Sequence, residues 1–258
     1  KFANKYWRIV RINEDNSVRL IYAGTSATDT AGFIRLAAEY NTNYKNSSYV
    51  GYMYTVGEQH GTSTNSNVKT IVDNWYVSNL NSYDNYISKT AIYCNDRTVT
   101  EGSWFATGSE EMLYSAHTRF NKYAQPSYVC SNASDRFTVS TSTGNGKLTY
   151  PIGLITADEA YYAGGGYYNS NSNYYLVQNA LNAEASWWTM TPNNYWRQGS
   201  GAGVFFIGVS EIGTIRNAGV YLDYFSVRPV ISLKSCVTVS GGNGTASNPY
   251  TVSVSSAC

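Results

Sequence analysis

The N-terminal part of the chain alternates short apolar runs with polar turns. Two apolar runs, residues 6–12 and 18–23, flank a stretch of Asn, Glu, Asp, Asn and Ser, and this arrangement predicts a β-hairpin. Residues 25–64 are polar and rich in Gly, Asn and Tyr, apart from one apolar run at residues 49–56. We expect this region to form long loops laid over the surface.

Two helices are predicted in the first half of the chain. Apolar residues recur at helical spacing over residues 67–80, directly after Ser66, a residue type that caps helix N-termini. A second helix is expected over residues 110–120, because Ser109 can cap it and the two glutamates at its start suit the positive end of a helix.

A buried strand and a short helix are predicted in the middle of the chain. Residues 152–155 form an apolar run that favours a buried strand. Thr156 and Glu159 have the spacing of a capping box, so a helix is expected to begin there and to run to about residue 163, where glycines stop it. Residues 138–147 are rich in Ser, Thr and Gly and predict an exposed loop.

Strand and turn patterns dominate the last third of the chain. Short β-type runs separated by Gly, Asn and Pro cover residues 187–190, 204–209, 214–216, 227–233, 237–239 and 250–254. Helices early and strands late predict an α+β fold. No linker divides the chain, so we expect a single domain over residues 1–258, with a core over residues 1–235 and a C-terminal β-hairpin appendage over residues 236–258.

Composition limits the classes of partner. Charged residues make up 14% of the 258 residues, against an ordinary share of about 25%, whereas the chain holds 25 Tyr. The net charge is +1 without a basic stripe, so nucleic-acid binding is not expected. No stretch approaches the ~20 apolar residues of a membrane span, so a membrane would be reached only through an anchor outside this chain. The chain opens at Lys1 without Met, which we interpret as a processed or trimmed product.

The cysteines are spaced too widely for a CxxC metal or redox motif. They are Cys94, Cys130, Cys236 and Cys258. The spacing favours the pairs Cys94–Cys130 and Cys236–Cys258, since each pair closes a local loop. A charge-poor, hydroxyl-rich chain with these cysteines fits an oxidising location, extracellular or at the cell surface. The alternative is a cytosolic protein with free, buried thiols.

Sequence motifs of catalysis and cofactor binding are missing. His60 and His117 belong to no HExxH motif or Cys/His ligand cluster, although His117 alone would be able to act as a base. Asp158 and Glu159 are adjacent acids, but their place at a predicted helix start explains them without catalysis. We therefore expect no cofactor, no metal and no enzymatic activity.

Blocks of sequence spread over the chain resemble a family of bacterial surface-protein domains of unknown function. They include Tyr-Trp-Arg-Ile-Val-Arg-Ile-Asn at 6–13, Cys-Asn-Asp-Arg at 94–97, Trp-Trp-Thr-Met-Thr-Pro at 187–192 and Val-Arg-Pro-Val-Ile-Ser-Leu at 227–233. The order of the Leu-Ile-Thr-x-x-Glu, Trp-Trp-Thr and Val-Arg-Pro blocks is also similar to C-type-lectin-like and formylglycine-generating-enzyme-like domains. That similarity implies a mixed sheet with two or three helices and long surface loops. The cysteine pair of those enzymes and the Glu-Pro-Asn type of sugar-binding motif have no counterpart here.

Residues that typically form recognition surfaces gather between the last two of these blocks. The candidate ligand-binding residues are Asn193, Asn194, Tyr195, Trp196, Arg197, Phe206, Arg216, Asn217, Tyr221, Asp223, Tyr224 and Phe225. This arrangement resembles the variable region of retroelement-diversified proteins. A second group of Tyr residues, within residues 161–175, can border the same site or can pack a loop onto the sheet. The alternative for residues 221–225 is that they fill a strand and a turn.

The sequence thus predicts a secreted or surface-attached, adhesin-like binding module. Its expected partner is a protein or glycan on another cell or on a phage. The alternatives are an enzyme of the formylglycine-generating type and a structural subunit of a pilus or surface filament.

We expect substitutions among related strains to concentrate between residues 193 and 225, because a diversified binding surface changes there while the scaffold stays constant. Sequencing the locus across strains measures this distribution. Substitutions spread evenly along the gene would contradict the prediction.

Overall fold

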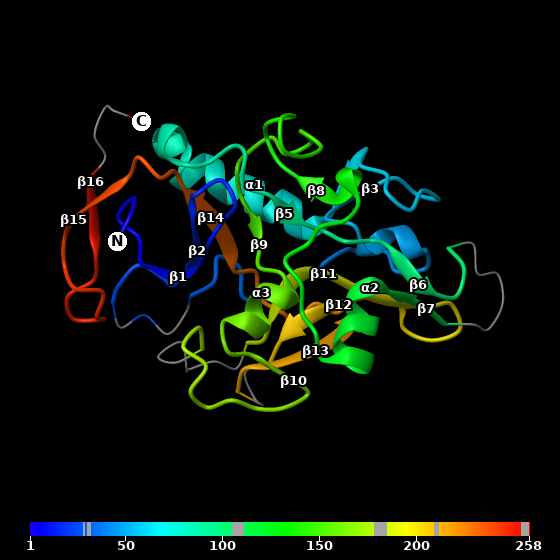
Figure 1. Ribbon diagram of the computed structural model, residues 1–258. Helices are drawn as coiled ribbons and strands as arrows, with labels where there is room; N and C mark the ends of the chain where they lie inside the picture. The colour runs from blue at the N-terminus through cyan, green and yellow to red at the C-terminus, as the bar shows by residue number, and fades with distance from the viewer. Residues whose placement is uncertain (28, 30–31, 105–110, 178–184, 209–211, 254–257) are drawn as a thin grey trace.

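A larger and a smaller β-sheet, with short helices against them, give the chain a mixed α+β fold (Figure 1). The structure is a computed structural model and describes residues 1–27, 29, 32–104, 111–177, 185–208, 212–253 and 258. The larger sheet is curled and runs in the order β10 (Gly166–Tyr167), β13 (Thr214–Gly219), β12 (Gly201–Ile207), β11 (Trp187–Trp196), β7 (Glu111–Tyr114) and β6 (Val99–Glu101). β10 pairs with β13 in parallel and the other neighbours pair antiparallel.

The smaller sheet joins the two ends of the chain. It runs in the order β1 (Trp7–Ile12), β2 (Val18–Tyr22), β14 (Pro229–Leu233) and β9 (Gly153–Leu154). Short antiparallel pairs accompany the sheets: β3 (Met53–Tyr54) with β4 (Thr64–Asn65), β5 (Tyr93–Cys94) with β8 (Arg136–Phe137), and β15 (Thr238–Gly241) with β16 (Thr251–Ser253). Short 3-10 helices are η1 (Ser47–Val50), η2 (Asn81–Tyr86) and η4 (Ala133–Asp135). The predicted N-terminal hairpin and the predicted C-terminal hairpin are both present.

Helix α1 (Asn67–Asn79) confirms the helix predicted from apolar spacing. The Ser66 hydroxyl accepts a hydrogen bond from the backbone N–H of Lys69, so Ser66 is the N-cap. The Trp75 ring lies 5.2 Å from the Tyr22 ring and 6.3 Å from the Trp7 ring. These contacts place α1 against the smaller sheet, as Figure 1 shows.

The predicted helix over residues 110–120 is wrong in its first half. Residues 111–114 form β7, which pairs with β11 and β6, and helix α2 (Ser115–Thr118) begins only after it and continues as a π-type turn, η3 (Arg119–Tyr123). Met112 and Tyr114 are fully buried, so the alternation of a strand outweighs the helix-start signals. Ser109 and Glu110 lie outside the described residues.

Helix α3 (Ala157–Tyr162) confirms the predicted capping box. The Thr156 hydroxyl accepts from the Glu159 N–H, and the Glu159 carboxylate accepts from the Thr156 N–H, each at 3.0 Å. The helix packs against β1 and against β11, β12 and β13, so it lies between the two sheets.

The prediction that residues 25–64 form loops over the surface is wrong in part. Tyr40, Val50 and Tyr52 are completely buried, and the Tyr40 ring lies 5.8 Å from the ring of Trp188 in β11. Val50 and Tyr52 belong to the apolar run at residues 49–56, whereas the polar surroundings of Tyr40 gave no sign of its burial.

Both disulfides expected from the cysteine spacing are present, Cys94–Cys130 and Cys236–Cys258. Two disulfides are compatible with an extracellular, non-reducing environment. Among the described residues, no helix has the length and apolar character to span a membrane.

The 94–97 segment joins distant parts of the chain through buried side chains. The Asn95 amide donates to the carbonyl oxygen of Met190 at 2.8 Å, and its oxygen accepts from the N–H of Tyr52 at 2.9 Å. Asn95 is fully buried, so these bonds fix the loop before β3 to the central strand β11.

Arg97 and Asp135 form a completely buried ion pair, with Arg97 Nε 2.8 Å from Asp135 Oδ1. Arg97 also donates to the carbonyl oxygens of Met53 (3.0 Å) and Gly61 (2.8 Å). The second Asp135 oxygen accepts from the Arg97 N–H and contacts His60 Nδ1 at 2.9 Å. His60 therefore has a structural contact in this network.

We expect Asp135→Asn to lower the free energy of unfolding by about 3 kcal/mol, because it leaves the buried Arg97 guanidinium without its counter-charge. Chemical denaturation followed by Trp fluorescence measures this loss. Glu101→Gln is the matched control, since the Lys122–Glu101 pair is exposed and its loss costs less than about 1 kcal/mol. Equal losses in the two variants would contradict the role given to the buried pair.

Candidate functional site

A hollow of about 420 Å³ lies on the larger sheet, over β12 and β13. We call it the aromatic hollow. Its described lining residues are Tyr168, Ser186, Phe206, Gly208, Thr214, Arg216, Asn217, Ala218, Leu222, Tyr224 and Phe225. This volume falls within the range of ordinary small-ligand pockets.

Alternation along the paired strands explains how the hollow is built. In β13, Thr214, Arg216 and Ala218 are two residues apart and all line the hollow, whereas Ile215 is fully buried. Asn217 departs from this alternation, because it also lines the hollow. Phe206 of β12 stands opposite Arg216 in the register of the two strands. The sheet thus offers an aromatic ring and a guanidinium side by side.

Tyr168 supplies the wall next to β13. Its backbone adopts the left-handed conformation, with φ at 51°, which is uncommon for a residue with a large side chain. The Arg216 guanidinium lies 5.3 Å from the centre of the Tyr168 ring, a cation–π distance. The Tyr168 hydroxyl donates to the Asn217 side-chain oxygen at 2.7 Å. These contacts hold both polar side chains at the edge of the hollow.

The segment after β13 supplies the other wall. Phe225 is buried, with its ring 4.2 Å from the Trp188 ring and 4.6 Å from the Phe206 ring. Tyr224 lies 4.6 Å from Phe225 and is 61% exposed. The buried Phe225 ring therefore supports the exposed Tyr224 ring at the hollow.

Five of the residues predicted from sequence meet in this hollow. They are Phe206, Arg216, Asn217, Tyr224 and Phe225. Four others are exposed but do not line it: Trp196, Arg197, Tyr221 and Asp223. Of these, Tyr221 packs against Tyr44 with the ring centres 4.4 Å apart.

The three remaining predicted residues are buried in β11. The Asn193 side chain contacts His117 Nδ1 at 3.2 Å, and the Asn194 side chain donates to the carboxylate of Glu111. The Tyr195 hydroxyl donates to the carbonyl oxygen of Lys45 at 3.1 Å. In this structure these side chains support the sheet from within and present no surface to a ligand.

Several lining residues were missed in the sequence. Thr214 and Ala218 flank Arg216 at a spacing of two, so alternation around Arg216 identifies them. Ser186 and Leu222 come from outside the strands, and no pattern in the sequence indicates them. Tyr168 belongs to the second Tyr group, and the structure shows that it borders the hollow.

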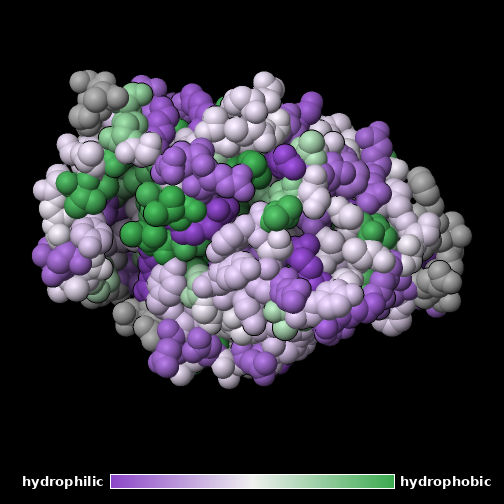
Figure 2. Space-filling model, viewed as in Figure 1, coloured by the Kyte–Doolittle hydropathy of each residue, from purple (hydrophilic) through white to green (hydrophobic). Residues whose placement is uncertain are grey.

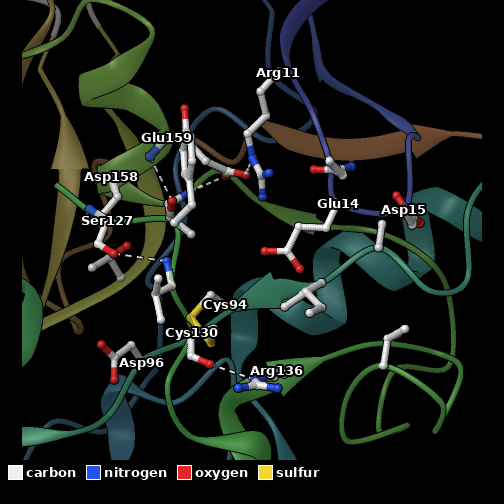
Figure 3. A pocket seen from close by; sticks show the side chains of 18 of the residues that line it. Arg11, Glu14, Asp15, Cys94, Asp96, Ser127, Cys130, Arg136, Asp158 and Glu159 are labelled. Atoms are coloured by element: carbon white, nitrogen blue, oxygen red, sulfur yellow. Dashed lines mark hydrogen bonds and ion pairs between the residues drawn. A yellow bond between two sulfur atoms is a disulfide. The ribbon is translucent and has the colours of Figure 1, made fainter.

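A second concave site, of about 390 Å³, lies between the β1–β2 turn, β5 and the start of α3 (Figure 3). We call it the polar cleft. Its charged lining residues are Arg11, Glu14, Asp15, Asp96, Arg136, Asp158 and Glu159. The Cys94–Cys130 disulfide forms part of its wall. Figure 2 shows an apolar patch over the β1 region next to hydrophilic side chains, and β1 carries the exposed side chains of Ile9 and Ile12.

The negative charge of Glu159 is balanced by two arginines of the same chain. Arg11 Nε lies 2.8 Å and Arg19 Nε 3.5 Å from its Oε1. Burial alone would raise the pKa of Glu159, but the two guanidinium groups and the Thr156 N–H lower it below its ordinary value. Glu159 thus caps α3 and ties it to β1 and β2.

Asp96 and Asp158 share the guanidinium of Arg119, at 3.1 Å and 3.0 Å respectively. Asp158 also accepts from the Ser127 N–H at 2.7 Å. Burial raises the pKa of Asp158 despite these partners. The shared arginine makes both carboxylates part of a structural network.

Among the described residues, no group of three or more His, Cys, Asp or Glu side chains is arranged to hold a metal ion. No protein-family model, no curated protein and no solved structure matches the chain. The resemblance to surface-protein and C-type-lectin-like domains therefore stays a prediction from sequence blocks.

The folded-state pKa of Glu159 lies below its ordinary value of 4.5, so ionised Glu159 stabilises the fold above that pH. This contribution is lost as the pH falls through the lowered pKa. We expect Glu159→Gln to lower the free energy of unfolding at neutral pH, and we expect its difference from the parent protein to shrink below pH 4.5.

Denaturation curves recorded at several pH values measure this difference. Glu58→Gln, which alters an exposed carboxylate, serves as the control and should show no such pH-dependent difference. A difference for Glu159→Gln that stays constant through the acid range would contradict the prediction.

Proposed function

We propose that this chain is a secreted or cell-surface binding module that recognises a protein or glycan on another cell or on a phage. The aromatic hollow is the proposed recognition site. Under this proposal Tyr168, Phe206 and Tyr224 supply ring faces, and Arg216 and Asn217 supply directional polar groups.

The observation that carries the proposal is the combination of exposed rings and polar groups in one hollow on a sheet. Interfaces draw most of their binding energy from a few Tyr, Trp and Arg side chains, and rings give contact area with few rotatable bonds. Tyr224 illustrates this combination, because it is largely exposed while its neighbour Phe225 is fixed in the core. Ligand contact with Tyr224 would require little ordering of the protein.

We further propose that the fold is C-type-lectin-like and that its ligand-binding surface is diversified by a retroelement. A C-type-lectin-like scaffold with a retroelement-diversified surface would carry its changing residues on the face that contacts ligands. Arg216, Asn217 and Tyr224 line the aromatic hollow and would be the changing residues, whereas the buried Asn193, Asn194 and Tyr195 belong to β11. Extracellular or cell-surface localisation is supported by the two disulfides.

We expect Tyr224→Ala and Tyr168→Ala to weaken binding by about tenfold or more, since removal of a central aromatic contact costs about 2 kcal/mol. Glycan arrays and arrays of bacterial and phage surface proteins, probed with the parent and variant chains, measure this effect. The array on which binding is found also decides between glycan and protein.

Tyr123→Ala is the matched control, because Tyr123 is also 61% exposed and does not line the hollow. Its binding should stay within about twofold of the parent, as for surface residues outside an interface. Variants of Tyr224 and Tyr168 that bind like the Tyr123 variant would refute the proposed site.

A further inference from the structure

Some charged side chains of the polar cleft form ion pairs within the protein, and others have no ion-pair partner among the described residues. Glu159 pairs with arginines, and Asp96 and Asp158 share Arg119. Glu14, Asp15 and Arg136 take no part in these ion pairs. Glu14 and Asp15 lie together in the β1–β2 turn, and Arg136 lies at the start of β8 on the same cavity, so the cavity has a negative and a positive side.

Two carboxylates without a cation stand in the β1–β2 turn. Glu14 is exposed, and no described residue binds its carboxylate. Asp15 accepts hydrogen bonds from the Ser17 N–H (3.0 Å) and the Thr90 hydroxyl (2.8 Å). Partial burial would raise the pKa of Asp15, but hydrogen bonds from Ser17, Ser88 and Thr90 lower it below its ordinary value. This wall is therefore negatively charged at neutral pH.

Arg136 provides the opposite charge from the start of β8. Its Nε donates to the carbonyl oxygen of Cys130 at 2.7 Å, and a second guanidinium nitrogen lies 3.4 Å from the carbonyl oxygen of Ser131. Within the described part of the chain, no carboxylate pairs with it. Figure 3 shows Glu14 reaching into the cavity from the turn, with Arg136 across the cavity from it.

We infer that the polar cleft binds a small zwitterion, namely a free amino acid or a short peptide, with its ammonium group hydrogen-bonded to Glu14 and its carboxylate at Arg136. The volume of about 390 Å³ accommodates such a molecule. Ammonium–carboxylate and guanidinium–carboxylate contacts are both charge-assisted hydrogen bonds, which are stronger than neutral ones. The site shares no lining residue with the aromatic hollow, so the inference is independent of the proposed function.

Isothermal titration calorimetry with glycine, glycylglycine and triglycine tests the inference and shows which length fits. For the best of these probes, we expect the N-acetylated form and the C-terminal amide each to bind about tenfold more weakly or worse, because each lacks one charge-assisted hydrogen bond. Glu14→Gln should abolish the discrimination against the acetylated form. Arg136→Gln should abolish the discrimination against the amide, and Arg136→Lys should keep part of it.

Glu58→Gln and Arg35→Gln are the matched controls. Arg35, like Arg136, donates to a backbone carbonyl, at 3.2 Å to Ala37, but lies outside the cleft. Both controls should bind the probe like the parent, and thermal unfolding checks that every variant is folded. The inference is overturned if none of the three zwitterions binds at millimolar concentration, or if both half-charged analogues bind as well as the zwitterion. It is also overturned if Glu14→Gln and Arg136→Gln discriminate like the parent.

Discussion

The buried ion pair between Arg97 and Asp135 is the constraint on which the arrangement of the molecule depends. A guanidinium and a carboxylate removed from water must satisfy each other and their remaining hydrogen-bond positions, or the fold loses several kcal/mol. Arg97 meets this demand by also binding the backbone at Met53 and Gly61. Its neighbour Asn95 binds the central strand β11, and Cys94 is linked to Cys130. One short segment thus fixes loops, disulfide and sheet relative to one another.

This fixation separates the parts that hold the structure from the parts that face solvent. The buried rings of Trp188 and Phe225 pack against the sheet, and Tyr224, next to Phe225, is left exposed. The polar cleft is divided in the same way. Its carboxylates Glu159 and Asp158 pair with arginines and thereby link α3 to β1 and to η3. Glu14 and Arg136 remain at its surface with no carboxylate–cation pair among the described residues. Both concave sites are therefore carried by a framework whose buried carboxylates Asp96, Asp135, Asp158 and Glu159 each have an arginine partner.

Local patterns in the sequence predicted those elements that local interactions decide. The helix after Ser66, the capping box at Thr156 and the strands after residue 187 follow from spacing and capping, and two cysteine loops follow from proximity in the chain. Residues 111–114 could not be predicted as a strand, since their pairing with β11 is made far away in sequence. Tyr40 in a polar stretch and Asn193 in an apparent recognition segment are buried for the same reason: burial depends on long-range packing. Likewise, no local signal brings Glu14 and Arg136 to one cleft.

Under the proposed function, the β10–β13–β12 face, with the segment after β13, is the surface that meets the ligand. Hydrogen exchange followed by mass spectrometry, with and without the partner identified on the arrays, tests it most directly. We expect binding to slow exchange in residues 212–226 and around Tyr168 and to leave the exchange of the C-terminal hairpin unchanged. Protection confined to the C-terminal hairpin or to α1, with none in residues 212–226, would contradict it.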